Sequence, residues 1–562
     1  MPNEKAGGHI SQLTLNNGDS LEIAKNDIVV FVGPNNAGKS QSLKDIYTLS
    51  EQKKPTVVIS DISITKSKAP ISKALAEITT GINNGNRISY YILGKHMNIW
   101  ADSDKEFPTE QYYGEYRDFF VANLDTSARL TICNPPESIT RQESKVHPIH
   151  YAAFDSKYRR WLSDSFKKAF GVEITPNTQY GSRIPLCIGK PVQLSGEYED
   201  EQSRLEEYAS ILDTYKQVQN QGDGIKSFTG ILLYLMLDYY RTYLIDEPES
   251  FLHPPQARIM GQIIGQTLSD QQQAFISTHS EEIIKGLLEV CPERIKIVRI
   301  TREKDTNMFS ILGNQKFEQV WNDPLLRYSN IMASLFHKSV VLCESDSDCK
   351  IYSIIESHIK QRAGKYSETL FIHCGGKHRM AKIIAALHSL NIGSMLITDI
   401  DVLNDETVFK RIIESCGGDY GRIQTDYNTI ISNLHSSKER VNRRVTKSAI
   451  DLVIDSNDSM DLTSRELREI RDIISTISKW EGLKRSGTAA LPPGDATSSF
   501  KQMDGLLRSY GIFIVPVGEL ECFIKEVGGH GPEWANAVLE KYPNLDDDVY
   551  RPITDFIESM NL

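Results

Sequence analysis

The sequence of 562 residues has few of the features that mark membrane and exported proteins. Its longest apolar runs, such as ILLYLML at 231–237, fall far short of the ~20 residues that a membrane helix needs. The start, MPNEKAGGHI, lacks the basic residues and apolar stretch of a signal peptide. We therefore expect no membrane-spanning segment, and a cytoplasmic location by default.

The sequence also lacks cysteine motifs and an excess of positive charge. The 8 cysteines are scattered, with no C-x-x-C pair and no His/Cys cluster at zinc spacing, which predicts reduced thiols and no zinc site. The formal net charge of -11 argues against non-specific binding along nucleic acid. Any binding of nucleic acid must therefore come from local basic patches. The length predicts two or three domains.

A phosphate-binding loop is present near the N-terminus. The segment DIVVFVGPNNAGKS predicts a β-branched strand at 28–32, a glycine-containing loop and the start of a helix. It fits G-x-x-x-x-G-K-[ST], in which backbone N–H groups surround phosphate oxygens, the lysine reaches the β- and γ-phosphates and the final hydroxyl binds Mg²⁺. The predicted ATP-binding residues of this loop are Gly33, Asn35, Asn36, Gly38, Lys39 and Ser40.

Two later strand ends fit the same nucleotide site. TYLIDEPESFLHP predicts a buried strand that ends in Asp246 and Glu247, where the Asp would hold Mg²⁺ and the Glu would orient or deprotonate the attacking water. QAFISTHS predicts a third short strand that ends at His279. A lone histidine there is more often a satisfied core residue, but after the two acids it is predicted to sense the γ-phosphate.

This order of motifs resembles the Walker B segment and H-loop of ABC-type ATPases, and DEPESFLHP is similar to the version in the RecF, SMC and OLD group. The resemblance implies that NQGDGIKSFTGILLYLML, at 220–237, contains a divergent signature loop. Ser227 would then face the γ-phosphate of a partner subunit, and the protein would be a homodimer. The alternative is an ordinary helix capped by Asp223.

Lys39 and Asp246 are 207 residues apart, which is long for a bare ATPase fold and predicts an insertion at about 60–220. Within it, apolar residues at helical spacing predict a helical arm, a dimerisation element or a core-facing helix. These residues are Leu205, Tyr208, Ile211, Leu212 and Tyr215.

A second pattern begins at residue 339, where short apolar strands alternate with helices and predict a parallel sheet. Glu344 follows the first strand, Gly375 and Gly376 the second, and Asp399 with Asp401 the third. Because the carboxyl ends of parallel strands meet at one edge, these acids are predicted to gather there. Crowded carboxylates repel one another unless a cation neutralises them, which favours Mg²⁺ or Mn²⁺.

The glutamate followed by SDSD, the GGK after the second strand and the D-x-D after the third resemble a TOPRIM domain. An ABC-type ATPase followed by TOPRIM is similar to the OLD (overcoming lysogenisation defect) nuclease family, which includes the Gabija nuclease subunit and retron-associated OLD effectors. The resemblance implies metal-dependent cleavage of DNA under ATPase control, often in anti-phage defence. It also implies a helicase-like partner, or a retron reverse transcriptase with its DNA.

Carried over to this sequence, the resemblance makes the GELE stretch a late acidic motif, with either Glu519 or Glu521 pointing inward. Lys525 becomes a candidate transition-state lysine, although a surface lysine would look the same. Ser345 departs from the family, in which glycine is typical after the first acid. The predicted catalytic residues are Glu344, Asp399, Asp401, Glu247 and Lys525, and the predicted metal ligands are Glu344, Asp348, Asp399, Asp401, Glu519 and Glu521, with Ser40 and Asp246 in the nucleotide site.

We therefore predict an α/β chain in three parts. They are a RecF/SMC-like ABC ATPase domain at 1–335 with its helical insertion, a TOPRIM domain at 336–535 with a helical insertion at about 404–510, and a helical tail at 536–562. The basic stretch SKERVNRRVTKS, at 437–448, would contact a phosphate backbone or form a solvated helix face. The alternative functions are a nucleotide-dependent sensor or scaffold with an inactive TOPRIM domain, and a nuclease of RNA.

Overall fold

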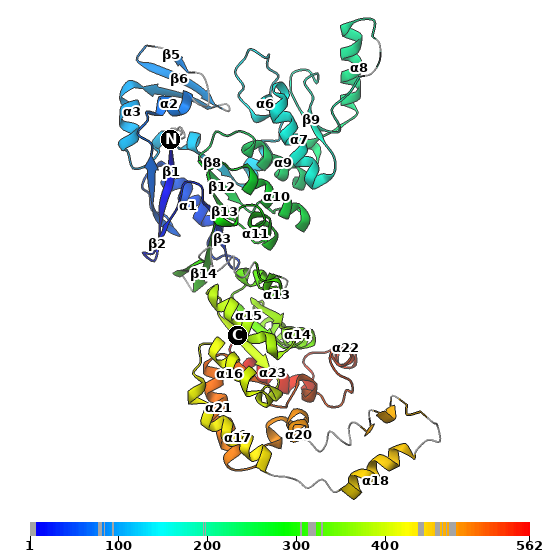
Figure 1. The fold of residues 1–562 in the computed structure, drawn as a ribbon. Helices are drawn as coiled ribbons and strands as arrows, with labels where there is room; N and C mark the ends of the chain where they lie inside the picture. The colour runs from blue at the N-terminus through cyan, green and yellow to red at the C-terminus, as the bar shows by residue number, and fades with distance from the viewer. Residues whose placement is uncertain are drawn as a thin grey trace. The chain divides into compact units, whose positions relative to one another are not determined.

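The computed structural model divides into two compact units, residues 1–318 and 319–562, each described by itself below (Figure 1). The boundary predicted from the sequence lies at 335. The structure describes residues 7–562 except 77–80, 84, 93–94, 195, 197, 304–305, 313–321, 328–329, 437–442, 456–460, 464, 468 and 471–478. Within this described part of the chain, no helix combines the length and apolar character needed to cross a membrane.

A six-stranded sheet forms the centre of the first unit, in the order β15-β14-β3-β13-β12-β8. All neighbouring pairs are parallel except β14 and β15. Every residue of β3 is buried, as expected for an apolar strand covered on both faces. The strands are β3 (Ile28–Val32), β8 (Val121–Leu124), β12 (Thr242–Asp246), β13 (Gln273–Ser277), β14 (Ile295–Glu303) and β15 (Thr306–Leu312).

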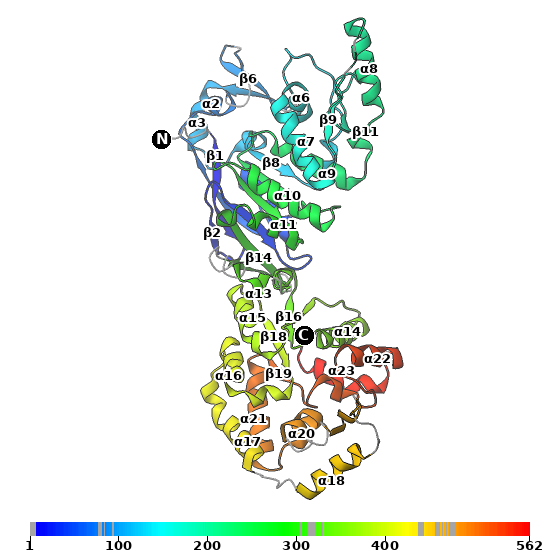
Figure 2. The same cartoon turned by 45° about the vertical axis from the view of Figure 1, so that its right-hand side comes forward.

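Helix α1 (Lys39–Glu51) and a small antiparallel sheet cover one face of the central sheet. That sheet has the order β2-β1-β4, and its apolar residues share one core with Phe31, Leu244 and Phe275 of the central strands. Helices α10 (Pro254–Thr267) and α11 (Glu281–Leu288) lie side by side on the other face (Figure 2). The small strands are β1 (Gly8–Leu15), β2 (Ser20–Glu22) and β4 (Ile59–Lys66).

The region expected as a helical insertion is mixed. Strand β4 belongs to the antiparallel sheet and β8 is an edge strand of the central sheet, so both are parts of the main body. Between them lies a second antiparallel sheet, and after β8 comes an α/β segment at 126–220. The helices and strands added to the main body are α2 (Ile71–Ala76), β5 (Ile82–Asn83), β6 (Arg87–Ile92), β7 (Lys95–Trp100), α3 (Ala101–Glu106), α4 (Arg117–Phe120), α5 (Thr126–Thr131), α6 (Pro148–Phe154), α7 (Ser156–Phe170), β9 (Ile174–Pro176), β10 (Leu186–Ile188), α8 (Glu201–Asp213) and β11 (Lys216–Gln217).

Helix α8 carries most of the apolar positions predicted in the insertion. Asp200 caps it by accepting a hydrogen bond from the N–H of Ser203 at 2.7 Å. Leu212 is its one buried residue, and Leu205 is 37% exposed. The helix is therefore an exposed arm over most of its length.

The second unit contains the predicted parallel sheet, in the order β17-β16-β18-β19, with every neighbouring pair parallel. The chain moves outward from β16 to β17 and then crosses back to β18 on the other side. Crevices at such reversals are where open α/β sheets bind ligands. The strands are β16 (Ser339–Cys343), β17 (Thr369–His373), β18 (Ser394–Thr398) and β19 (Ile512–Ile514), with α14 (Asp346–Arg362) after β16 and α15 (Lys377–Ser389) after β17.

Helices connect β18 to β19 and complete the second unit. The described helices of the connection are α16 (Glu406–Ser415), α17 (Gln424–Ser436), α18 (Arg443–Ile454), α20 (Lys479–Ser486) and α21 (Asp495–Ser509). Beyond the sheet, α22 (Pro532–Lys541) and α23 (Arg551–Glu558) bury Trp534 and Ile553 in the same core as Val341 of β16. The expected tail at 536–562 is thus packed into the core of this unit.

Candidate nucleotide site and candidate metal centre

The loop between β3 and α1 adopts a conformation that favours glycine. Gly33 has a φ of 141° and Gly38 a φ of 106°. A side chain at Gly33 would place its Cβ 1.9 Å from the carbonyl oxygen of Ile300. Both glycines are therefore required by geometry, and the turn brings the loop to the N-terminus of α1, where backbone N–H groups bind phosphate.

Lys39 begins helix α1 and is only 4% exposed. Its Nζ donates hydrogen bonds to the carbonyl oxygens of Gly33 at 2.8 Å and Pro34 at 2.7 Å. Burial lowers the pKa of Lys39 to about 8, against the charges of three nearby carboxylates, of which Glu247 acts most strongly. A phosphate at this loop would favour the protonated lysine further.

Two acids and a histidine stand at the carboxyl ends of β12 and β13. Asp246 accepts a hydrogen bond from the hydroxyl of Ser277. Glu247 has a φ of 47° and its N–H donates to the carbonyl oxygen of Ser277 at 2.9 Å. His279 Nε2 lies 3.5 Å from Glu247 Oε1. Burial, followed by the charge of Lys39, lowers the pKa of His279, so this imidazole is neutral at pH 7.

These groups meet around one cavity of about 750 Å³. A volume of roughly 300–1,000 Å³ is usual for small-molecule sites, so a nucleotide fits. Among the predicted residues, the cavity is lined by Asn35, Asn36, Gly38, Lys39, Ser40, Glu247 and His279. Gly33 adjoins it through its hydrogen bond to Lys39, and Asp246 directly precedes Glu247.

Two residues that hydrogen-bond to the acid and the histidine of this site were not predicted from the sequence. Glu249 accepts hydrogen bonds from the N–H of His279 at 2.6 Å and the hydroxyl of Thr278 at 2.9 Å, and burial raises its pKa. Fully buried Arg129 donates from Nη1 to the carbonyl oxygen of Glu247 at 3.0 Å. Glu249 lies within DEPES and could have been noticed, whereas Arg129 comes from α5 and no motif marks it.

Ser227 does not face outward as the signature-loop interpretation requires. It lies on helix α9 (Asp223–Leu235), where it is fully buried, so its hydroxyl is not presented to a second subunit. The alternative also needs correction, because the helix begins after Gly222 without a side-chain cap. Asp223 instead forms an ion pair with Lys226 at 2.7 Å.

In the second unit, three predicted carboxylates meet where the sheet order reverses. Glu344, Asp399 and Asp401 each place an oxygen within 4.8 Å of the others. Glu344 Oε1 accepts hydrogen bonds from the hydroxyl of Thr398 at 2.8 Å and the N–H of Asp399 at 3.1 Å. These bonds fix the direction of Glu344 toward the end of β18.

Burial and mutual repulsion disfavour ionisation of these acids. Burial raises the pKa of Asp399 well above its usual value, and the charge of Glu344 adds to the rise. Burial also raises the pKa of Glu344, with Asp401 adding to the rise and a hydrogen bond from Thr398 opposing it. A divalent cation would stabilise all three as carboxylates, and an oxygen-only donor set suits Mg²⁺ or Mn²⁺.

The acids of the GELE stretch form a second group. Glu519, Glu521 and His530 place ligand atoms within 4.8 Å of one another. Both carboxylates point inward, since the side chains of Glu519 and Glu521 are 16% and 13% exposed. Glu521 accepts a hydrogen bond from the N–H of Gly531 at 2.6 Å and lies 2.7 Å from His530 Nδ1. His530 was missed because nothing in its glycine-rich surroundings suggests a metal ligand.

Asp348 and Ser345 also act as a helix cap. The N–H of Ser345 donates to Asp348 Oδ2 at 2.8 Å, and the N–H of Asp348 donates to Ser345 Oγ at 3.2 Å. This capping box at the start of α14 gives the serine, which stands where glycine is typical, a physical role. Burial raises the pKa of Asp348 and the charge of Glu521 adds to the rise, so Asp348 also lies near the acids.

The lysines that contact the acids differ from the predicted one. Lys525 is exposed. Lys484 of α20 places its Nζ 3.1 Å from Glu519 Oε2, and Lys377 of α15 places its Nζ 3.0 Å from Asp401 Oδ1. Burial lowers the pKa of Lys484, but the charges of Glu519 and its neighbours outweigh that effect and raise it overall.

Half of the basic stretch at 437–448 lies outside the described residues, which exclude 437–442. Arg444 and Lys447 are exposed on helix α18. Their exposure is consistent with both sequence interpretations, a phosphate contact and a solvated helix face.

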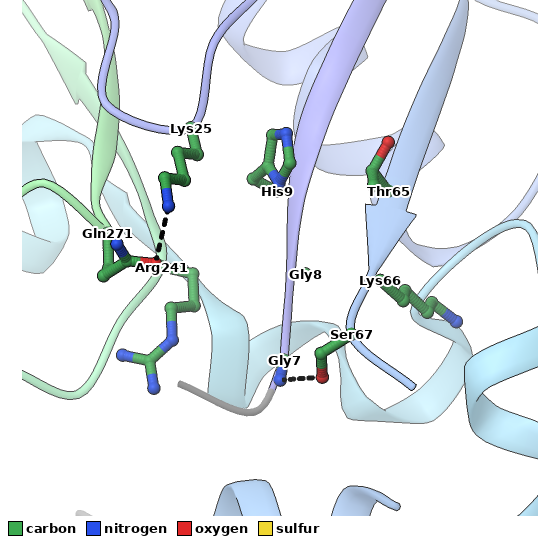
Figure 3. Close-up of a pocket in the computed structure, with 9 residues that line it drawn as sticks. All are labelled: Gly7, Gly8, His9, Lys25, Thr65, Lys66, Ser67, Arg241 and Gln271. Carbon is green, nitrogen blue, oxygen red and sulfur yellow. Dashed lines mark hydrogen bonds between the residues drawn. The ribbon is translucent and has the colours of Figure 1, made fainter. Parts of the chain in front are cut away.

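A smaller pocket in the first unit has three basic residues in its lining, Lys25, Lys66 and Arg241 (Figure 3). Its volume is about 60 Å³, far below that of the nucleotide cavity. Lys25 Nζ donates to Gln271 at 3.4 Å, and Lys66 Nζ donates to the carbonyl oxygens of Phe107 and Tyr112 at 2.9 and 2.6 Å. The pocket is therefore a poor candidate for a nucleotide.

Two family models match the chain. Residues 28–285 match the AAA_21 model, an AAA domain associated with the AbiEii toxin of type IV toxin–antitoxin systems. Residues 335–401 match the model described as an overcoming lysogenization defect protein-like TOPRIM domain. These matches confirm the predicted pairing of an ATPase with a TOPRIM domain. A comparison with curated proteins finds no match.

Solved structures similar to the chain include SMC head domains. The Thermotoga maritima head domain is 13% identical, with 54% of this chain and 99% of that chain covered and a TM-score of 0.29. A Pyrococcus furiosus Smc head with an extended coiled coil, bound to the C-terminal domain of ScpA, is 10% identical, with coverages of 56% and 98% and a TM-score of 0.34.

Proposed function

Since the chain joins an AAA-type ATPase domain to an OLD-like TOPRIM domain, as an OLD-family ATPase–TOPRIM fusion does, we propose that it is an ATP-controlled, metal-dependent endonuclease. The observation that supports this most is the convergence of Glu344, Asp399 and Asp401 within 4.8 Å at one sheet edge. Duplex DNA is the substrate that we propose, and the OLD resemblance suggests anti-phage defence as the setting.

The acidic edge would bind divalent ions through its carboxylates. Glu344, Asp399 and Asp401 would hold one ion, and Glu519 with Glu521 a second. Bound Mg²⁺ or Mn²⁺ supplies activation of the attacking water and stabilisation of the leaving oxygen. The protein's own contribution is to fix the ligands before substrate arrives, as Thr398 does for Glu344.

In the ATPase domain, the phosphate loop would hold the nucleotide through Lys39 and the N-terminus of α1. Ser40 and Asp246 would bind Mg²⁺, because Ser40 lines the cavity, the charge of Asp246 acts on Lys39, and Ser277 fixes Asp246 by a hydrogen bond. Glu247 would orient or deprotonate the attacking water, and neutral His279 would contact the γ-phosphate. We further propose a homodimer, and a helicase-like protein or a reverse transcriptase with its DNA as partner.

The proposed function predicts that purified protein cuts duplex DNA in the presence of Mg²⁺ or Mn²⁺ and not in EDTA. Cleavage is measured on labelled duplex DNA, with duplex RNA and tRNA offered in parallel reactions. Cutting of RNA alone would reassign the substrate. No cutting of any substrate with either ion, with and without ATP, would instead favour the scaffold alternative.

Lys484 is expected to matter more for cleavage than Lys525. Lys484 is the cation beside Glu519 at the acidic edge, and a positive charge there would stabilise the pentacovalent phosphorane. Lys484→Ala should lower the cleavage rate about 10²-fold or more, a typical cost of losing one such group. Lys525→Ala, which removes an exposed lysine, is the matched control and should stay near the wild-type rate. Equal losses in both variants would contradict this assignment.

A further inference from the structure

The insertion of the first unit contains a cavity that neither site uses. Its volume is about 450 Å³. It lies between exposed helix α8 and the segment that holds α6, α7 and β9, which Figures 1 and 2 show beside α8. Pockets of roughly 300–1,000 Å³ are of the size that binds nucleotides and other small molecules.

Positive charge dominates the lining of this cavity. Arg141, Arg159 and Arg204 line it, and among the described residues of the lining there is no aspartate or glutamate, although the chain as a whole carries a net charge of -11. Three guanidinium groups around one hollow favour a ligand with a phosphate or carboxylate, because arginine binds both through paired hydrogen bonds.

The three arginines differ in how far their guanidinium groups already have hydrogen-bond or ion-pair partners. Arg159 donates to the carbonyl oxygens of Ala152 and Ala153 at the end of α6, which fixes its guanidinium in the wall. Arg204 pairs with Glu201 at 3.1 Å on the surface, where such pairs are weak and exchange readily. Arg141 is exposed and makes no hydrogen bond or ion pair with the described residues.

The other walls suit a flat, partly apolar group. Phe154 and Tyr208 present aromatic rings from α6 and α8, and Leu205 lies beside them at 37% exposure. Aromatic side chains of this kind stack on nucleobases. Gln179 contributes an amide that can both donate and accept hydrogen bonds with a base edge.

From this combination we propose that the cavity binds a nucleotide unit, with its phosphate toward the arginines and its base between Tyr208 and Phe154. The unit comes from a free mononucleotide or from the 5′-phosphorylated end of a strand, which share this chemistry. The site lies outside the phosphate loop, so it goes beyond the proposed nuclease and its ATP site. A ligand bound there would contact α8, and any effect on the ATPase domain would be transmitted through the insertion.

The test measures AMP binding to the full-length Lys39→Ala protein by isothermal titration calorimetry in EDTA. Lys39→Ala weakens the phosphate-loop site, and without metal the acidic edge repels phosphate. We expect one AMP per chain. Arg141→Glu should weaken AMP about tenfold or more, since it replaces an attractive charge by a repulsive one. Arg160→Glu, an exposed charge reversal on the same helix as Arg159 but outside the lining, is the matched control.

Further ligands identify the source of the nucleotide, and a second variant with a folding check separates loss of binding from loss of structure. Tyr208→Leu keeps apolar bulk and removes the ring, so it should also weaken AMP, and thermal unfolding checks each variant. Binding of the 5′-phosphorylated dinucleotide pApA but not of AMP supports the site with a strand end as its source. Binding of neither, equal losses in the Arg141 and Arg160 variants, or equal binding of adenosine overturns the proposal. The AMP-binding result does not depend on the proposed nuclease activity, so it stands even if the protein does not cleave DNA.

Discussion

Replacing Asp399 with asparagine is expected to abolish DNA cleavage while ATP binding stays unchanged. Asp399 is partly buried in the acidic edge, so the asparagine removes one negative ligand from a site that solvent reaches only in part. Loss of a bound metal removes several kcal/mol of transition-state stabilisation, so the rate should fall about 10³-fold or more. Initial cleavage rates with Mg²⁺ and Mn²⁺, and calorimetric titration of each ion, measure the effect.

Asp346→Asn is the matched control, because Asp346 is an exposed residue in the first turn of α14 close to the same edge. Its cleavage rate should stay near that of the wild type. Undiminished cutting by Asp399→Asn, and by the double variant in which Asp399 and Asp401 are both alanine, would show that the active site lies elsewhere or that a contaminant cuts.

The same variant has a pH-dependent effect on stability, with a sign that follows from its pKa. The pKa of Asp399 is higher in the folded protein than in the unfolded chain, so between those two values the folded state binds more protons. Stability of the metal-free wild type should therefore fall as pH rises above about 4. Asp399→Asn removes this loss, so in EDTA at pH 7 it should unfold at a higher temperature than the wild type. Added Mg²⁺ should stabilise the wild type more than the variant.

Replacing Glu247 with glutamine should stop ATP turnover without preventing ATP binding. The amide keeps the shape of the side chain beside His279 but loses the basic oxygen, and general-base catalysis is typically worth about 10²–10⁴-fold. Lys39→Ala should instead weaken binding itself, because Lys39 lies at the phosphate loop. Phosphate release measures ATP turnover and nucleotide titration measures ATP binding. DNA cleavage by each variant, with and without ATP, shows whether ATP activates or inhibits cleavage.

Glu281→Gln is the control for Glu247→Gln, since Glu281 lies two residues after His279, where it pairs with Lys285 on the outside of α11. It should turn ATP over at the wild-type rate. An unchanged ATPase rate in both the Lys39 and the Glu247 variants would refute the assignment of the nucleotide site.

The sequence was sufficient to predict which residues gather at the ends of parallel strands. Glu247 and Asp399 follow buried apolar runs, and the carboxyl edge of a parallel sheet brings such residues together without knowledge of the fold around them. The reversal of strand order between β16 and β18 was not predicted, yet the prediction of a shared edge did not depend on it. Residues that lie directly after a strand are therefore the most predictable part of both sites.

Residues that reach a site from a distant helix were not predictable. Arg129 contacts Glu247 across 118 positions of sequence, and Lys484 contacts Glu519 from a helix without any motif. Lys525 was chosen because it is close in sequence, but the chain turns its side chain into solvent. The prediction for Ser227 assumed that a polar residue at the start of a helix is exposed. Tertiary packing buries this serine instead.

The topology of the second unit also determines when its acidic edge is completed during synthesis. Strand β19, the acids of the GELE stretch and the core residues of α22 and α23 all follow residue 511 in the sequence, yet β19 pairs with β18 and the helices share a core with β16. A polypeptide still being translated therefore lacks part of its own acidic edge. All the carboxylates of this edge are present only once synthesis has passed residue 521, so a nuclease centre of the kind proposed would arise late in the translation of this unit.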